Sequence, residues 1–361
     1  KEVFANFLAS KIAKEVYPDV NHDLNFLRMY QTRARSTDRT QGTHPIQQTL
    51  ENLNSAGLLY GNIIYEKAPV MMRKLEEQMG ERRFQEGLQE YLNTYTYGNA
   101  TWDDLINILD RHAPEARLKD FSTAWVKQKG MPTITTTWQD GQLVVRQHDP
   151  YGRHLCWQQK FTVDAYYPDR MKTIPVNLQD SVKTIKLPEQ PLRLVPNADG
   201  SGYGLFLLDE QTVDTMTPQD DLKRFALAMN LYENCRAHHL SADRFATLMN
   251  KWLAEERNGM IGAQLVNYWG SAVADMADNE RHAQEELMWA QYRHHPIASV
   301  RQRLVRQLYA SCTSAAVADS LYNIWKGQTD SLLSKNDYTQ MAYRLALLKP
   351  TLWRTILDTQ R

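Results

Sequence analysis

The chain opens with KEVFANFLASKIAKEVYP, residues 1–18, in which apolar residues recur at the spacing of an α-helix. We expect one side of this helix to be buried, and its members are Val3, Phe4, Phe7, Leu8 and Ile12. A second side carries small residues below the carboxylate of Glu2, where another helix could approach closely: Ala5, Ala9 and Ala13. Pro18 cannot continue the helix and marks its end.

A glutamate at the start of an apolar helix has two interpretations. Glu2 is either an N-terminal carboxylate, which the helix dipole stabilises, or a metal ligand. The residues of this stretch leave both interpretations open. No initiator Met, signal peptide or helix N-cap precedes Lys1, so we expect the chain to be part of a longer protein.

Length and composition indicate a folded protein of two or three domains. The chain has 361 residues, and 42% of them are hydrophobic, which is ample for real cores. Lys plus Arg and Asp plus Glu both number 42, and this zero net charge argues against nucleic acid or an anionic membrane as the main partner. No apolar run approaches the ~20 residues of a membrane span. The 3 cysteines are far apart in sequence, so we expect them to be small buried apolar groups.

Hydrophobic periodicity divides the chain into three parts. Residues 1–130 are predicted to be helical, 131–210 to form a small antiparallel β-sandwich, and 211–361 to form a C-terminal helical domain. The expected strands alternate in polarity around turn residues such as Asp140-Gly141, a hairpin signal. The last part has helical patterns joined by short polar links, typical of antiparallel helix pairs stacked in an irregular solenoid. The predicted fold is therefore multi-domain and mainly α, with one β-sandwich.

The first part contains several local signals. Asn21 or His22 is expected to open a second helix, and the polar stretch 33–48 is predicted to be a loop. A long helix is expected over Leu58–Met79. Thr101 is a good N-cap for a further helix, because two aspartates follow it in the first turn.

Residues 1–5, KEVFA, resemble the segment that carries the third zinc ligand in the aminopeptidase N (alanyl aminopeptidase) family of zinc metallopeptidases, or gluzincins. The family context is Trp-Leu-Asn-Glu-Gly-Phe-Ala, so Lys1 and Val3 replace the usual Asn and Gly. Later stretches resemble family segments in the same order: Thr43-His44-Pro45-Ile46, Tyr65-Glu66-Lys67, Tyr97 to Thr101, and Trp125 with Gly130 and Pro132. At the end of the expected sandwich, Gly204 and Leu205 replace a usual Tyr-Arg.

This resemblance implies a fold and a chemistry. Residues 1–130 would be the helical half of a thermolysin-like catalytic domain, with Glu2 as a zinc ligand and Tyr65 as a catalytic residue that stabilises the oxyanion. The longer protein would use zinc to release the N-terminal residue of a peptide substrate. A non-catalytic relative, which binds peptides or acts as a scaffold, is the alternative.

The resemblance also implies that the site in this chain is incomplete. The family's H-E-x-x-H and G-A-M-E-N motifs precede the segment that residues 1–5 resemble, and no two of the 10 histidines are four residues apart. We therefore expect the missing N-terminal part of the same protein to be a partner. We also expect this chain alone to be inactive and to bind zinc weakly, because a catalytic zinc needs three protein ligands.

Ala68-Pro69 stands where the family has Gly-Ala after the Tyr65 segment. In a continuous α-helix, the N–H of residue 69 would bond the carbonyl of Tyr65, and Pro69 has no N–H. We expect the turn holding Tyr65 to be kinked, or a new helix to start at Pro69. Either arrangement would turn Tyr65 into the cleft that Glu2 also faces.

Overall fold

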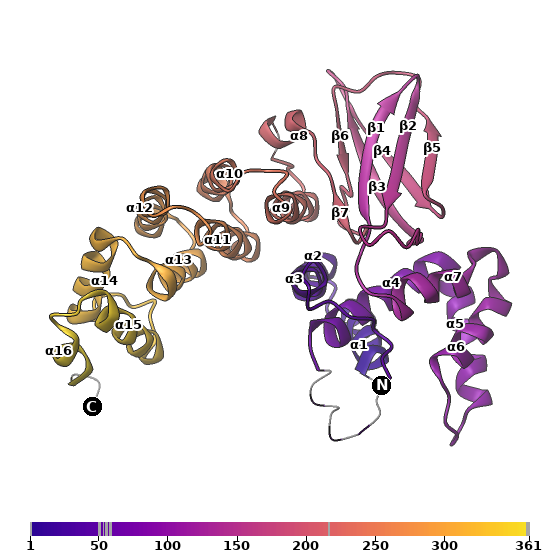
Figure 1. Cartoon of the computed structure of the whole chain (residues 1–361), viewed down its shortest axis with the longest axis horizontal. Helices are drawn as coiled ribbons and strands as arrows, with labels where there is room; N and C mark the ends of the chain where they lie inside the picture. Colours follow the sequence, from indigo (N-terminus) through magenta and orange to yellow (C-terminus); the bar gives the residue numbers. More distant parts are fainter. Residues whose placement is uncertain are drawn as a thin grey trace. The chain divides into compact units, whose positions relative to one another are not determined.

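The protein folds into two compact units, Lys1–Asn230 and Leu231–Arg361 (Figure 1). The structure is a computed structural model that describes residues 2–49, 52, 54, 57, 60–215 and 217–358, apart from the side chains of Glu2, Gln211, Asp214, Thr215 and Leu357. The predicted mainly helical fold with sheets between two helical regions is confirmed. The secondary structure changes where the sequence predicts, since β1 begins at Thr133 and α8 at Glu210. The division into three domains at these points stays a prediction.

The first unit begins with helices that start and end at the expected signals. Asn21 caps the second helix, because its side chain accepts a 3.0 Å hydrogen bond from the N–H of Leu24. Thr101 and Asp104 form a reciprocal capping box at the start of α6. The helices are α1 (Glu2–Val16), α2 (His22–Phe26), α3 (Thr32–Asp38), α4 (Ala68–Met79), α5 (Glu81–Thr94), α6 (Trp102–His112) and α7 (Leu118–Ser122), with π-helical turns at Leu27–Gln31, Ile63–Lys67 and Thr123–Lys127.

The predicted buried side of α1 is only partly correct. Phe7 is buried, and Val3 and Phe4 pack against the same core. However, Leu8 is 44% exposed and Ile12 is 61% exposed. The reason is that the elements against which α1 packs, namely α2, α4 and the Ile63–Lys67 turn, cover only the side of the helix that carries Phe7.

The predicted loop over 33–48 is wrong in its first part, because α3 continues to Asp38. The polar residues that suggested a loop are inside the protein: Arg35 is 0% and Asp38 is 1% exposed. Arg35 donates to the side chain of Gln31 at 2.9 Å and to the carbonyl of Gly202 at 2.8 Å. Arg35 and Asp38 are therefore polar because they form buried hydrogen bonds and ion pairs, and not because they lie in a solvated turn.

Three consecutive carbonyls join the helices of the first unit to the sandwich. Gly200, Ser201 and Gly202 accept hydrogen bonds from Gln31 (2.7 Å), Lys74 (2.7 Å) and Arg35 (2.8 Å), respectively. The donors are buried side chains, and the acceptors follow the last strand of the three-stranded sheet. Since each donor and acceptor is removed from water, losing one partner would leave the other unsatisfied at a cost of about 1–3 kcal/mol.

The strands form a sandwich of two sheets around one apolar core. One sheet has the order β5-β2-β1-β7 and the other β4-β3-β6. The predicted hairpin is confirmed: Asp140 and Gly141 both have positive φ, as a two-residue hairpin turn requires. The strands are β1 (Thr133–Gln139), β2 (Gln142–His148), β3 (Gln159–Tyr166), β4 (Met171–Leu178), β5 (Val182–Lys186), β6 (Arg193–Pro196) and β7 (Leu205–Phe206).

The sandwich is not wholly antiparallel, and this part of the prediction is wrong. β7 pairs with β1 in parallel, through bonds from Leu205 N–H to the Pro132 carbonyl and from Leu207 N–H to the Ile134 carbonyl, both 2.9 Å. A parallel pair needs a long connection, and the five intervening strands supply it. Gly204 allows the close approach, because a Cβ there would lie 2.7 Å from the Pro132 oxygen.

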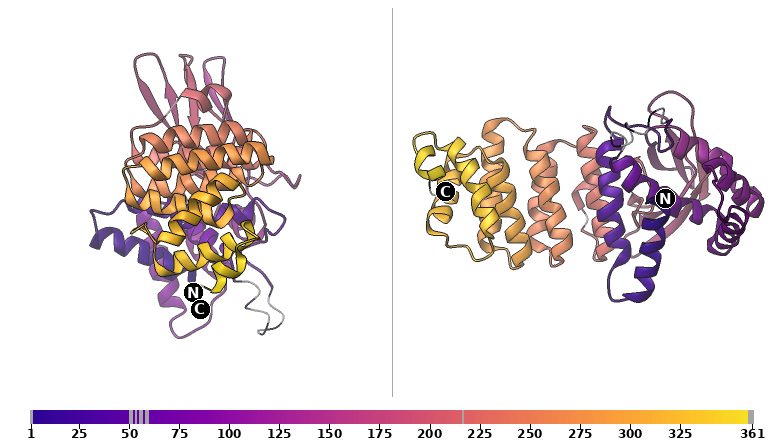
Figure 2. Two further views of the ribbon diagram at one scale, coloured as in Figure 1. Left: turned by 90° about the vertical axis from the view of Figure 1, so that its left-hand side faces the viewer. Right: turned by 90° about the horizontal axis from the view of Figure 1, so that it is seen from below.

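The second unit is a stack of helices, which agrees with the predicted solenoid-like arrangement (Figure 2). α11 packs against α10 and α13, α13 against α12 and α15, and α15 against α14 and α16. No helix in the described part of the chain is long and apolar enough to cross a membrane. The bounds are α8 (Glu210–Thr215) and α9 (Asp221–Arg236), followed by α10 (Ala242–Glu255), α11 (Gly259–Val273), α12 (Asp278–His294), α13 (Ala298–Ser311), α14 (Ala315–Gly327), α15 (Lys335–Leu348) and α16 (Trp353–Asp358).

Lys74 predicts a pH dependence of stability for the first unit. Burial lowers the pKa of its amine from 10.5 to about 8. Between these values the unfolded chain binds this proton and the folded chain does not, so the free energy of unfolding rises with pH. Below pH 8 both states bind the proton, and the cost of the buried charge is present in full.

We therefore expect Lys74→Met to remove a rise of about 3 kcal/mol between pH 8 and pH 10.5. Urea unfolding of the first unit at several pH values in this window measures it. The exposed Lys183→Met is the matched control and should keep the wild-type slope. Equal slopes in wild type and Lys74→Met would show that Lys74 is charged in the folded state across this range.

Candidate functional site

Tyr65 lies in the middle of a short π-helical turn, Ile63–Lys67. The N–H of Ala68 bonds the carbonyl of Ile63, five residues back, and α4 then starts at Ala68 with Pro69 in its first turn. Pro69 has no N–H for the carbonyl of Tyr65, so a continuous α-helix through this turn would lack that bond. The expected departure from α-helical geometry is confirmed. The first residues of the predicted Leu58–Met79 helix lie outside the described part of the chain.

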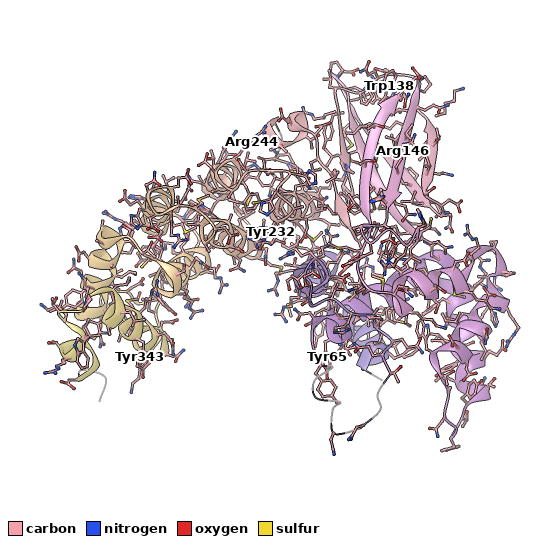
Figure 3. The ribbon with its side chains drawn as sticks, in the orientation of Figure 1. Tyr65, Trp138, Arg146, Tyr232, Arg244 and Tyr343 are labelled. Atoms are coloured by element: carbon pink, nitrogen blue, oxygen red, sulfur yellow. The ribbon has the colours of Figure 1, made fainter. Side chains whose placement is uncertain are left out.

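The two ends of this turn are buried, while its middle is not. Ile63 and Lys67 are both 0% exposed, and Tyr65 is half-buried between them. Figure 3 shows the Tyr65 side chain projecting from the edge of the helical group rather than into it. Its ring is tilted against that of Tyr60, with centroids 5.7 Å apart. Tyr65 is therefore on the side of the turn that faces away from the core.

A carboxylate and a second tyrosine lie near this turn. Burial raises the pKa of Glu66, and Arg33, whose Nη1 lies 3.7 Å from Oε1, acts in the opposite direction. Burial and the charge of Glu66 together raise the pKa of Tyr30. Each shift favours the neutral form of the group that titrates.

Glu2 is the first residue of α1, and α1 packs against both α4 and the Ile63–Lys67 turn. The structure thus brings together the two elements that carry the predicted site residues. The side chain of Glu2 lies outside the described part of the chain. Its orientation toward the cleft of Tyr65 stays a prediction.

Within the described residues, no group of three or more His, Cys, Asp or Glu could hold a metal ion. His44 has a different role: its Nδ1 lies 2.9 Å from the carbonyl of Pro45 and also contacts Gln48. That Glu2 is one of three zinc ligands stays a prediction.

The sequence analysis missed a buried ion pair beside the Tyr65 turn. Lys67 Nζ lies 2.7 Å from Asp38 Oδ2, and both side chains are 0% exposed. Lys67 also donates to the carbonyl of Gly130 at 2.9 Å, and Asp38 Oδ1 accepts from Thr43 at 2.6 Å. One feature of the sequence indicates that Lys67 is buried: it stands four residues after the apolar Ile63, so the two residues share one side of a helix.

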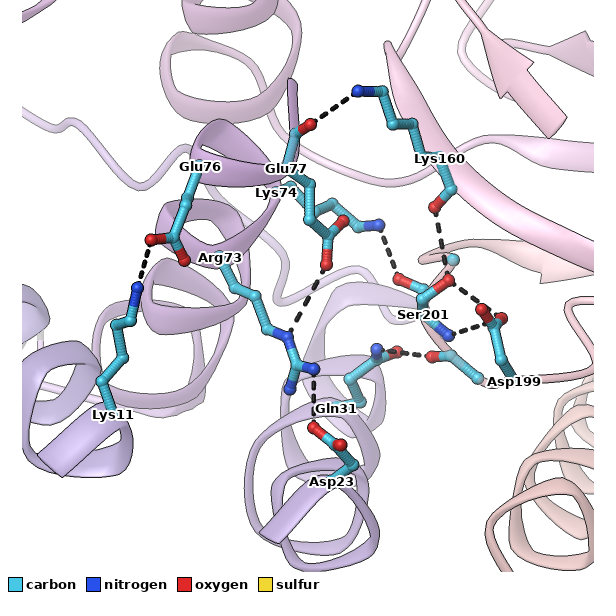
Figure 4. Close-up of polar contacts among 12 residues, drawn as sticks. Lys11, Asp23, Gln31, Arg73, Lys74, Glu76, Glu77, Lys160, Asp199 and Ser201 are labelled. Carbon is cyan, nitrogen blue, oxygen red and sulfur yellow. Dashed lines mark hydrogen bonds and ion pairs between the residues drawn. The ribbon is translucent and has the colours of Figure 1, made fainter. Parts of the chain in front are cut away.

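A pocket of about 470 Å³ lies elsewhere, between α1, α2, α4 and the start of α5. Several of its charged side chains form ion pairs with one another (Figure 4). Arg73 bridges Asp23 at 2.7 Å and Glu77 at 3.6 Å, and Lys11 pairs with Glu76. Tyr65 does not line this pocket, so it is not the cleft that the sequence predicts for that residue.

Comparison with known proteins finds similarity to one family over the first part of the chain. Residues 1–125 match the Peptidase family M1 domain. The chain is 24% identical over 306 residues to "Aminopeptidase 2, mitochondrial" of Saccharomyces cerevisiae, covering 79% of this chain and 31% of the relative. It is 30% identical over 133 residues to "Aminopeptidase M1-B" of Oryza sativa subsp. japonica, covering 37% of this chain and 15% of the relative.

A third relative is "Tricorn protease-interacting factor F2" of Thermoplasma volcanium, 22% identical over 261 residues, covering 71% of this chain and 32% of the relative. The chain thus spans about a third or less of the length of these relatives. The resemblance seen in the sequence is confirmed over residues 1–125.

We expect the isolated chain to bind zinc only weakly, because it contributes one predicted ligand of three. After equilibration with zinc and dialysis, metal analysis should find well under one ion per chain. The Glu2→Gln variant should give the same low value. One tightly held ion per chain, lost in Glu2→Gln, would show that this sequence holds a complete site.

Proposed function

We propose that this chain, whose residues 1–125 match the Peptidase family M1 domain, is a portion of a zinc-dependent aminopeptidase. In the longer protein, Glu2 would be the third zinc ligand and Tyr65 would stabilise the oxyanion. The observation that carries this proposal is the packing of α1, which begins at Glu2, against the turn that holds Tyr65. The substrate would be a peptide with a free N-terminus.

The chemistry of each residue follows from its type and place. A bound zinc ion would polarise the scissile carbonyl and lower the pKa of a water molecule. Glu2 is the first residue of α1, and a carboxylate at this place would be a suitable zinc ligand. Tyr65 offers a neutral O–H donor on an anchored turn. Such a donor stabilises the oxyanion as negative charge develops on the substrate oxygen.

The exposed side of α1 supports a second part of the proposal. Leu8, Ile12 and Val16 are 44%, 61% and 58% exposed and recur at helical spacing on one side of α1. A contiguous apolar side of this kind is typical of an interface. We infer that it packs against the part of the longer protein that supplies the remaining zinc ligands.

In the longer protein, we expect Tyr65→Phe to lower kcat by about two to three orders of magnitude, with a smaller effect on KM. The hydroxyl is lost while the ring stays, so the fold should be unchanged. Steady-state hydrolysis of an aminoacyl anilide measures the effect. Tyr60→Phe, on the neighbouring ring, is the matched control and should turn over at the wild-type rate. Wild-type turnover by Tyr65→Phe would remove Tyr65 from the mechanism.

Glu2→Ala in the longer protein should lower zinc affinity and abolish turnover, since one of three ligands is lost. Glu15→Ala, an exposed glutamate near the other end of α1, is the control and should keep one zinc ion per chain. Metal analysis after dialysis measures both. Unchanged zinc content in Glu2→Ala would contradict the ligand role. Peptide binding without turnover in the wild type would instead favour the non-catalytic alternative.

A further inference from the structure

The Lys67–Asp38 pair connects four segments that are distant in the sequence. Asp38 ends α3, Thr43 follows it, Lys67 ends the π-helical turn, and Gly130 precedes β1. The pair is fully buried, with Nζ and Oδ2 2.7 Å apart. The remaining bonds are the 2.9 Å contact of Lys67 with the Gly130 carbonyl and the 2.6 Å contact of Thr43 with Asp38.

Such a pair is a costly way to stabilise a core. Removing two charges from water costs several kcal/mol for each, and well-packed apolar residues often do as well. What this pair adds is a fixed position for both side chains, because the hydrogen bonds of Lys67 to Gly130 and of Thr43 to Asp38 hold its two ends in a narrow range of geometries. In this fold, the pair fixes the orientation of the π-helical turn that ends at Lys67.

Tyr65 stands two residues before Lys67, and residues two apart in a helix do not share a side. Holding Lys67 and Ile63 in the core therefore turns Tyr65 outward. A π-helical turn contains one residue more per hydrogen-bonded ring than an α-helical turn. If the turn relaxed to α-helical spacing, the residues before it would rotate by roughly 100° relative to α4, and Tyr65, in the middle of the turn, would rotate by part of that angle.

We propose that the buried Lys67–Asp38 ion pair fixes the π-helical turn and thereby aims the Tyr65 hydroxyl, so that Lys67 is a positioning residue for the reaction. The consequence for catalysis rests on the proposed function. The structural consequence is that the pair sets the environment of the Tyr65 ring. It can be tested on this chain without the rest of the longer protein. These two consequences are tested separately.

The first test uses this chain, labelled with ¹³Cζ-tyrosine, with the Tyr65 signal assigned by its loss in Tyr65→Phe. The double variant Lys67→Met/Asp38→Asn removes both charges together, which avoids leaving one buried and unpaired. We expect the Tyr65 signal to shift or to split into several conformers. Lys74→Met is the matched control: it removes another fully buried lysine that bonds a backbone carbonyl, and it should leave the Tyr65 signal in place.

An unchanged Tyr65 signal in the folded double variant would overturn the proposal. An equal shift in Lys74→Met would do the same, because it would show a general loosening of the unit. If the double variant does not fold, Thr43→Val replaces it as the test of the proposal. It keeps both charges and removes only the hydroxyl that bonds Asp38, and it should shift Tyr65 in the same direction by less. No shift in Thr43→Val would then overturn the proposal.

The second test uses the longer protein. The double variant should lower kcat by about 10- to 100-fold, the range expected when a reacting group is displaced by about 1 Å, with KM changed less than twofold. Lys74→Met should retain wild-type kcat. If Tyr65→Phe keeps wild-type turnover, the proposed function fails while the tyrosine signal still tests the pair. If the signal test fails and Tyr65→Phe is inactive, the positioning role fails and the function stands.

Discussion

The ion pair between Lys67 and Asp38 is the interaction on which the arrangement of the first unit depends. It is fully buried, and through Gly130 it reaches the segment that leads into the β-sandwich. Lys67 Nζ also lies 5.8 Å from the ring centroid of Tyr203, which lies between β6 and β7 of the same sandwich. One ammonium group therefore contacts a helix, the entry to the sandwich and the segment that leaves its smaller sheet. Each contact would lose its partner if the lysine moved to solvent.

The same principle recurs between the helices and residues 200–202. Gln31, Lys74 and Arg35 each cross from a helix to a backbone carbonyl of this segment. Backbone groups near the end of a strand have no ladder partner, and they must be satisfied when they are buried. Polar side chains from the helices provide these bonds, so the helices and the sandwich of the first unit form one compact structure. Tyr65 and the start of α1 are both part of this compact structure.

Sequence reasoning succeeded where a local pattern has a local cause. The caps at Asn21 and Thr101 and the hairpin at Asp140-Gly141 depend on residues within four positions of one another. The break at Pro69 is equally local, since it follows from one missing N–H. Reasoning failed where the cause is distant. The helix over Arg35 and Asp38 looked like a loop because the buried partners of these residues lie elsewhere in the sequence. The exposure of Ile12 depends on which elements cover α1.

The sequence by itself determined the helical and strand-rich stretches, the resemblance to zinc aminopeptidases and the candidate residues Glu2 and Tyr65. These follow from residue type, spacing and order, which are properties of the chain before it folds. Only the tertiary structure decided the parallel pairing of β7 with β1, the burial of Lys67 with Asp38, and the side of the turn on which Tyr65 lies. Each of these depends on which surfaces meet: the spacing of Lys67 from Ile63 indicates that the lysine is buried, but nothing in the local sequence names Asp38 as its partner.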